Sequence, residues 1–184
     1  DYPEVELFVN GKSYGRQHKW TSEQAQTSTD SLSLLRRYRL MWMNVVYEPG
    51  ELKAVAYDIH GNKVSEETIC TAGKPHHLEL ISNRSNLQAD GKDLAYITVR
   101  LVDINNNLCT GDDQMISMKV KGMGYYKAGA NGDATCLDLF NRPLMPTFKG
   151  QLTAIVQSLE KNGTIVFEAS AKGLKTSKLF IQVY

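Results

Sequence analysis

Two acidic residues near the start of the chain have a spacing that could serve catalysis. Glu4 and Glu6 alternate with Val5 and Leu7, so both carboxylates lie on one face of a predicted strand. Paired carboxylates act as acid and base where their surroundings push their pKa values apart. A solvated strand face shows the same pattern, and no further nucleophile or base completes a constellation. We therefore expect no catalytic residue in this chain.

Metal ligands are sparse as well. His76 and His77 are adjacent, so on a strand their rings would point to opposite faces and share one ion poorly. Oxygen-rich turns hold calcium in some β-sandwiches. The acidic residues in such turns are Asp112, Asp113, Asp133 and Asp138. They lack an EF-hand pattern and suit ordinary polar turns, so we predict neither a metal site nor a cofactor.

Aromatic rings are the remaining candidates, because their flat faces stack on pyranose sugars. Trp20 lies in a polar stretch without an evident core partner. Tyr125 and Tyr126 are adjacent, so at most one of them faces solvent on a strand. These three residues are our candidate carbohydrate contacts. Trp42 lies in an alternating segment, residues 40–45, which predicts a strand with this ring in the core.

The basic residues do not indicate a nucleic-acid partner. Arg36, Arg37 and Arg39 surround Tyr38, which favours a solvated strand face or a contact between domains. The 184 residues carry a formal net charge of only +1, unlike a typical nucleic-acid binder. No apolar run approaches the roughly 20 residues of a membrane-spanning helix. One disulfide or three apolar thiols both remain open for the cysteines, which are Cys70, Cys109 and Cys136.

Apolar residues recur with a period of two along most of the chain, which is typical of β-strands. In "EVELFVNG", Asn10 and Gly11 provide the positive φ angles of a two-residue type I′ hairpin. "ELKAVAYD" and "NKVSEETICT" predict further strands. The polar segment 19–31 predicts an irregular loop, and we expect residues 21–31 to be mobile in isolation. Short strands between turns indicate antiparallel sandwiches.

A break at "GKP", residues 73–75, indicates a domain boundary. We predict two tandem immunoglobulin-like β-sandwiches, in residues 1–73 and 74–184. In the second module, alternation predicts strands in "HHLELIS", "LAYITVRLVD", "QMISMKVKG", "GQLTAIVQS", "GTIVFEAS" and "LKTSKLFIQVY", and residues 129–149 are expected to be irregular. The first module is shorter than the roughly 100 residues of a complete immunoglobulin fold, so its first strand is expected upstream of residue 1.

The segment "YPEVELFVNGKSYG" resembles the stretch that follows the catalytic barrel in glycoside hydrolase family 2 enzymes, particularly bacterial β-galactosidases. "YEPGELKAVAYDIHGNKV" and "TAGKPHHLEL" resemble the rest of that module and its joint to the next. "LQADGKDLAYITVRLVDINNNL", "NRPLMPTFKGQLTAIVQS" and "ASAKGLKTSKLFIQV" resemble the C-terminal domain, which is similar to bacterial immunoglobulin-like, invasin-type domains. The resemblance covers nearly the whole chain except residues 20–35.

The resemblance implies a non-catalytic, accessory part of a larger glycosidase. The catalytic carboxylates of that family lie on a (β/α)₈ barrel of about 250 residues, and this sequence has no βα alternation, so they do not carry over. The implied partners are the catalytic barrel of the same parent chain, which this region would brace, and a polysaccharide. The resemblance allows an oligomeric parent and implies a periplasmic or secreted location.

Two other hypotheses differ in class. An adhesin-like surface repeat that binds protein or glycan is the main alternative, because the pattern of the second module is shared with such repeats. The two halves of the chain show no internal repeat that would support it. An independent enzyme is disfavoured, since the sequence provides no catalytic constellation.

Overall fold

The protein is described by a computed structural model that covers residues 2–21, 23–24, 35–36 and 38–184. Contacts divide the chain into two compact units, unit 1 (Asp1–Thr71) and unit 2 (Ala72–Tyr184), close to the expected boundary. Strands dominate the described residues, so the predicted all-β class is confirmed. Within that part of the chain, no helix has the length and apolar character needed to cross a membrane.

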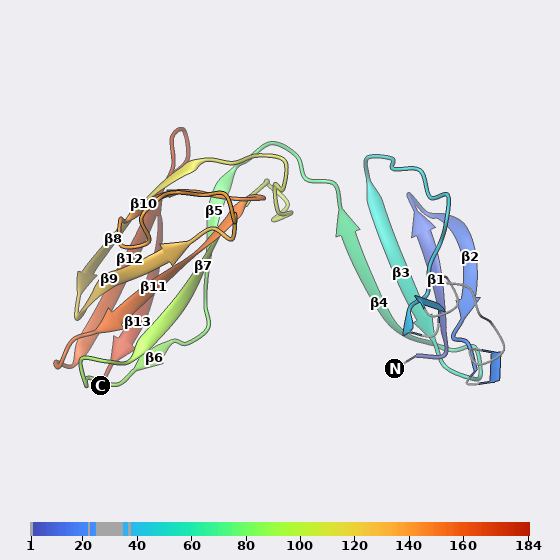
Figure 1. Ribbon diagram of the computed structural model, residues 1–184, viewed down its shortest axis with the longest axis horizontal. Helices are drawn as coiled ribbons and strands as arrows, with labels where there is room; N and C mark the ends of the chain where they lie inside the picture. Colours follow the sequence, from blue (N-terminus) through green and yellow to red (C-terminus); the bar gives the residue numbers. More distant parts are fainter. Residues whose placement is uncertain (1, 22, 25–34, 37) are drawn as a thin grey trace. The chain divides into compact units, whose positions relative to one another are not determined.

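Unit 1 contains one antiparallel sheet of four strands in the order β2-β1-β3-β4 (Figure 1). Its strands are β1 (Glu4–Val9), β2 (Lys12–His18), β3 (Glu51–Tyr57) and β4 (Lys63–Cys70). The central pair, β1 and β3, joins segments that are more than 40 residues apart in the sequence. The completeness of this module as a sandwich, with a first strand upstream, stays a prediction.

The predicted hairpin is confirmed at Asn10 and Gly11. Val9 pairs with Lys12 across a two-residue turn, and the turn residues have φ angles of 49° and 79°. The Asn10 side chain also reaches the start of β3. Its Oδ1 accepts a hydrogen bond from the Glu51 amide at 2.8 Å, and its Nδ2 donates to the Pro49 carbonyl at 3.2 Å. One asparagine therefore shapes the turn and fastens it to the neighbouring strand.

The sheet of unit 1 has an incompletely covered apolar face. Directly paired residues on antiparallel strands share a face, and the registers place seven apolar residues together. This apolar face consists of Val5, Leu7, Val9, Leu52, Ala54, Ala56 and Ile69. Val9 and Ala56 are buried, whereas Leu52 is 41% and Ile69 64% exposed. The β4 side of this face therefore presents hydrophobic surface to its surroundings.

The strand predicted for residues 40–45 is wrong. Among the described residues between His18 and Glu51, the chain forms no strand, and Asn44 has a φ of 67° in a turn. Trp42 is half-buried rather than in the core. Its indole Nε1 donates to the Gly15 carbonyl at 2.9 Å. The alternating residues 40–45 therefore form a segment outside the sheet, which is bound to β2 by side-chain hydrogen bonds.

The predicted irregular loop of residues 19–31 contains helical backbone at Glu23 and Gln24. A reciprocal capping box joins Thr21 to Gln24 at this point. The Gln24 amide donates to Thr21 Oγ1 at 3.3 Å, and the Thr21 amide donates to Gln24 Oε1 at 3.0 Å. Most of this loop, and with it the expected mobility of residues 21–31, lies outside the described residues.

Unit 2 is a sandwich of two sheets, visible as two layers of strands in Figure 1. One sheet has the order β5-β7-β11-β9 and the other the order β10-β8-β12-β13-β6. All pairs are antiparallel except β13 with β6. The strands are β5 (His77–Ser82), β6 (Asn86–Leu87), β7 (Leu94–Val102), β8 (Met115–Gly122), β9 (Gly124–Ala130), β10 (Leu144–Pro146), β11 (Gln151–Ser158), β12 (Gly163–Ser170) and β13 (Ser177–Val183).

The core of unit 2 lies between these sheets. Strands β11 and β12 alternate buried and less buried residues along their length, as a half-buried strand requires. The side chains of Phe167, Ile165 and Ile97 are fully buried in this core. Each such side chain contributes about 1.5–3 kcal/mol through removal from water. The period-two pattern of apolar residues in the sequence therefore predicts this core correctly.

The region predicted as irregular, residues 129–149, contains strand β10 and the end of β9. Strand β10 pairs only with β8 and so forms one edge of its sheet. Its three residues end in Pro146, and Pro143 precedes it. Proline is tolerated at such an edge because one side of the strand needs no hydrogen-bond donor. These prolines, together with the short length, concealed the strand.

Asp103 organises the turn after β7 and holds the start of unit 2. It is only 2% exposed, and its Oδ2 accepts a hydrogen bond from the Gly73 amide at 2.7 Å. Its Oδ1 accepts from the amides of Asn105 and Asn107 at 2.8 and 2.9 Å. The Gly73 amide first, and then those of the turn, lower the pKa of Asp103 to about 2. The ionised carboxylate is therefore part of the folded structure.

We expect Asp103→Asn to destabilise unit 2 at neutral pH, with a difference from the wild type that shrinks in acid. The folded pKa of about 2 lies below the ordinary value of 3.8, so the stabilisation is present above pH 3.8 and is lost as the pH falls toward 2. Urea unfolding of both proteins between about pH 7 and pH 2.5 measures this difference. Asp112→Asn, at an exposed position in the next turn, is the control. A difference that is equal at pH 7 and pH 3 would contradict the expectation.

Candidate functional site

A pocket of about 360 Å³ lies beside strand β2 in unit 1. We call it the basic pocket, because Arg, Lys and His side chains provide half of its described lining, which includes no acidic residue. The lining residues are Arg16, Gln17, His18, Lys19, Trp20, Gln24, Arg36, Arg39, Leu40 and Met41. Its volume lies within the roughly 300–1,000 Å³ of typical small-ligand sites.

Side chains attach the outer wall of the basic pocket to β2. Gln17 Nε2 donates to the Met41 carbonyl at 2.6 Å, and the Met41 amide donates to Gln17 Oε1 at 3.2 Å. The indole of Trp42 adds its hydrogen bond to the Gly15 carbonyl. The Arg39 amide donates to the Leu35 carbonyl at 2.9 Å, which is helical spacing. These bonds place the chain from Arg39 to Trp42 along the edge of the sheet.

Trp20 is the sequence-predicted site residue that lies in this pocket. Its ring is half-buried, and the Arg36 guanidinium lies 5.4 Å from the ring centre, within cation–π range. Arg39 lines the same space. The structure thus brings together Trp20 and two arginines that the sequence suggested as a solvated strand face or domain contact. Arg37 lies outside the described residues.

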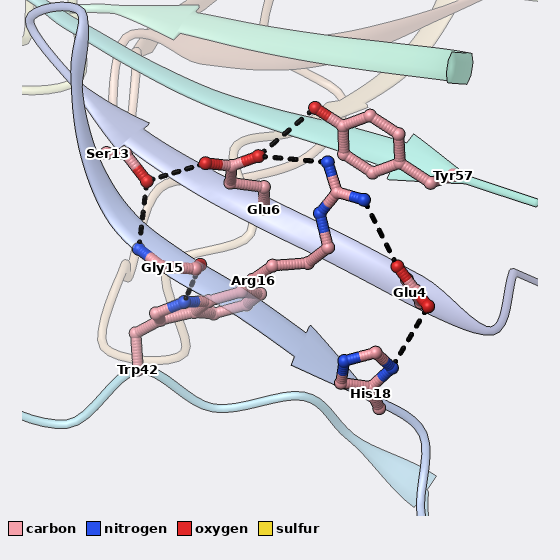
Figure 2. A network of polar contacts seen from close by, with 8 residues as sticks. All are labelled: Glu4, Glu6, Ser13, Gly15, Arg16, His18, Trp42 and Tyr57. Atoms are coloured by element: carbon pink, nitrogen blue, oxygen red, sulfur yellow. Dashed lines mark hydrogen bonds and ion pairs between the residues drawn. The ribbon is translucent and has the colours of Figure 1, made fainter. Parts of the chain in front are cut away.

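Arg16 connects the basic pocket to a polar network on the sheet, shown in Figure 2. Its guanidinium lies 3.5 Å from the centre of the Tyr57 ring. It pairs with Glu4 at 3.3 Å and with Glu6 at 3.5 Å. His18 Nδ1 lies 3.1 Å from the other Glu4 oxygen. Both carboxylates therefore lie on one strand face as predicted, and both contact the same arginine.

The surroundings of Glu6 favour the ionised carboxylate. Ser13 Oγ donates to it at 2.6 Å, and the Tyr57 hydroxyl donates at 3.1 Å. The Ser13 hydrogen bond is the main cause of a lowered Glu6 pKa, with contributions from Tyr57 and Arg16. A general acid needs a raised pKa instead. The network is therefore suited to hold structure and charge, and Glu6 is not suited to donate a proton.

The other two predicted contacts, Tyr125 and Tyr126, lie on β9 in unit 2. Tyr125 is 40% exposed, and Lys127 lies 5.9 Å from its ring centre. Tyr126 packs against the core. Its hydroxyl donates to the carbonyls of Phe140 and Arg142 at 3.2 and 3.0 Å. Of this pair, Tyr125 is thus the one with a ring face available for a ligand.

The candidate metal ligands have internal roles. Asp113 accepts hydrogen bonds from Thr147 Oγ1 and the Gly150 amide, and Asp133 accepts from Thr135. The rings of His76 and His77 do not point apart, since their Nδ1 atoms are 3.1 Å from each other. In the described part of the chain, no cluster of three or more His, Cys, Asp and Glu residues is placed to hold a metal ion. All three cysteines are free thiols.

Comparison with known families identifies both parts of the chain. Residues 78–179 match the family described as glycoside hydrolase family 2 C-terminal domain 5. The chain belongs to glycoside hydrolase family 2. Residues 1–65 match a domain of unknown function (DUF4982). The resemblance found in the sequence is confirmed, and the chain corresponds to an accessory C-terminal region of family 2 enzymes.

Relatives agree with this assignment. The chain is 36% identical over 178 residues to the β-galactosidase BoGH2A of Bacteroides ovatus, covering 97% of this chain and 19% of that protein. A family 2 structure from Bacteroides cellulosilyticus matches all of the chain and 22% of its own length, with a TM-score of 0.84 at 28% identity. A β-glycosidase from Bacteroides vulgatus matches 99% of the chain and 21% of its own length, with a TM-score of 0.83 at 26% identity. This family 2 chain spans about a fifth of the length of these relatives.

We expect Gln17→Ala to release the outer wall of the basic pocket. Loss of the acceptor for the Met41 amide should speed hydrogen exchange at that amide about two- to tenfold, the effect of one net hydrogen bond. The Thr71 amide, bonded to the Gly50 carbonyl at 2.8 Å, should keep its exchange rate. Amide exchange followed by NMR measures both. Lys12→Ala on the same strand is the control, and an unchanged Met41 rate in Gln17→Ala would contradict this role.

Proposed function

We propose that this chain is the accessory region of a family 2 β-galactosidase. The supporting observation is the 36% identity to the Bacteroides ovatus β-galactosidase along 97% of the chain. A 26% identical β-glucuronidase of Formosa agariphila provides the second candidate activity for the parent protein. The galactosidase is favoured because its similarity is the higher of the two. We further propose, by family resemblance alone, that the parent is periplasmic or secreted.

The apolar face of unit 1 supports a bracing role. Leu52 and Ile69 are directly paired and both exposed, Ile69 more than Leu52, although burying such side chains would contribute about 1.5–3 kcal/mol each. The chain spans about a fifth of the length of its relatives. We propose that the catalytic domain of the parent chain covers this face.

Contact with polysaccharide is the second part of the proposal. Trp20 in the basic pocket and Tyr125 on β9 offer aromatic rings near polar side chains, which suits the binding of a pyranose. The two residues belong to different units, so each would contact its own portion of a glycan. An oligomeric parent is compatible with this arrangement and is not required by it.

The activity of the parent protein tests the main proposal. We expect the full-length protein to hydrolyse a nitrophenyl β-galactoside faster than the matching β-glucuronide, and the 184-residue chain to hydrolyse neither. Initial rates from released nitrophenol measure both activities. Faster hydrolysis of the glucuronide would replace the proposed substrate class. Turnover by the 184-residue chain itself would contradict an accessory role.

The bracing role predicts a different effect of Ile69→Lys in the short and the long protein. In the 184-residue chain this surface change should alter the free energy of unfolding by less than about 0.5 kcal/mol. In the full-length parent it should lower the melting temperature, because it buries a charge between domains. Ile59→Lys, at a residue 79% exposed in the turn between β3 and β4, is the matched control. Equal effects of both variants in the parent would contradict bracing through this face.

A further inference from the structure

The charge of the basic pocket exceeds what a neutral sugar needs. Its cationic or titratable basic residues are Arg16, His18, Lys19, Arg36 and Arg39. Neutral saccharides are recognised by aromatic faces and by polar groups that bond to hydroxyls. A concentration of like charge in a concave site instead raises the local concentration of an anionic ligand. The pocket therefore suits a ligand that carries negative charge as well as a ring.

The positive charges of the pocket differ in how far they are already neutralised. Arg16 and His18 both contact Glu4, and Arg16 also contacts Glu6. By contrast, no carboxylate of the described residues forms an ion pair with Arg36 or Arg39. The charges paired with these carboxylates lie on β2, whereas Arg36 and Arg39, which have no such partner among the described residues, line the pocket from a later segment of the chain. An incoming anion would meet its strongest attraction at these two arginines.

We propose that the basic pocket binds an acidic saccharide, a pyranose that carries a carboxylate or a sulfate ester. Arg36 and Arg39 contact the anionic group. A guanidinium can donate two parallel hydrogen bonds to a carboxylate or to a sulfate ester. Trp20 lies beside Arg36, so a ring attached to the anionic group contacts the indole. The choice of a saccharide rests on the proposed function, whereas the choice of an anion rests on the charges of the pocket.

Calorimetric titration of the 184-residue chain tests the proposal with three oligosaccharides of equal length. One is rich in uronic acid, one is sulfated, and one is a neutral galactan fragment. We expect saturable binding of at least one acidic saccharide, tighter than that of the neutral one. Whether the uronic-acid or the sulfated oligosaccharide binds more tightly identifies carboxylate or sulfate as the preferred anionic group. Arg36→Ala/Arg39→Ala should weaken this binding at least about tenfold, the loss expected for charge-assisted hydrogen bonds.

Two further variants separate a specific site from general charge. Arg36→Lys/Arg39→Lys keeps the charge but loses the planar fork, so it should bind with intermediate affinity. Lys172→Ala/Lys175→Ala removes the same charge from exposed positions in unit 2 and should leave binding unchanged. Circular dichroism checks that each variant is folded.

Several results would overturn the proposal. These are no binding of either acidic saccharide at millimolar concentration, equal binding of the neutral galactan, and unchanged binding in the double alanine variant at Arg36 and Arg39. Inorganic sulfate that competes as well as the saccharide on an equal molar basis would reduce the pocket to a general anion site and would overturn it as well. A galactosidase parent whose accessory region binds only neutral galactan would refute the acidic ligand and leave the proposed function intact.

Discussion

The site in unit 1 depends on the open edge of strand β2. This strand is the first in its sheet, so its outer backbone groups have no neighbouring strand, a situation that proteins cover in order to avoid unwanted pairing. Here side chains provide the cover. The Gln17 side chain donates to the Met41 carbonyl and accepts from the Met41 amide, and the Trp42 indole donates to the Gly15 carbonyl. Because no second strand is needed, the covering segment is free to curve away and leave a pocket.

The two units are stabilised in different ways. Unit 2 has a continuous core of fully buried side chains between two sheets. In unit 1, the described hydrophobic residues that are buried are Val9, Val55 and Ala56. One face of its sheet carries a polar network centred on Arg16, and the other is apolar and partly exposed. Such a unit gains stability when another domain covers its apolar face, as the bracing role requires.

Local patterns predicted most strands and the hairpin, because alternation and turn chemistry act between near neighbours in the sequence. They failed where the structure depends on interactions between residues far apart in the sequence. Residues 40–45 alternate like a strand, but the bonds from Trp42 and Gln17 hold this segment without β-pairing. The capping box of Thr21 and Gln24 was present in the sequence as "TSEQ" and could have indicated the start of a helix.

The basic pocket was beyond local prediction for a similar reason. Trp20 and Arg36 are 16 positions apart, and neither spacing nor periodicity brings them together. Their meeting depends on the helical residues after Thr21 and on the attachment of Met41 to β2. The aromatic residue could therefore be selected as a candidate from its polar surroundings, whereas the arginines that define the charge of its site could not.

The two carboxylates with the spacing of a catalytic pair have a different physical role. Both carboxylates contact the guanidinium of Arg16, and the pKa of Glu6 is lowered by its hydrogen bonds from Ser13 and Tyr57 and by Arg16. Glu4 and Glu6 thereby act as counter-ions for Arg16 and orient it across the Tyr57 ring. This compensation stops at the edge of the sheet. The positive charge of Arg36 and Arg39 lies beyond it, so the two arginines are the groups of the described lining that we expect to attract an anion most strongly.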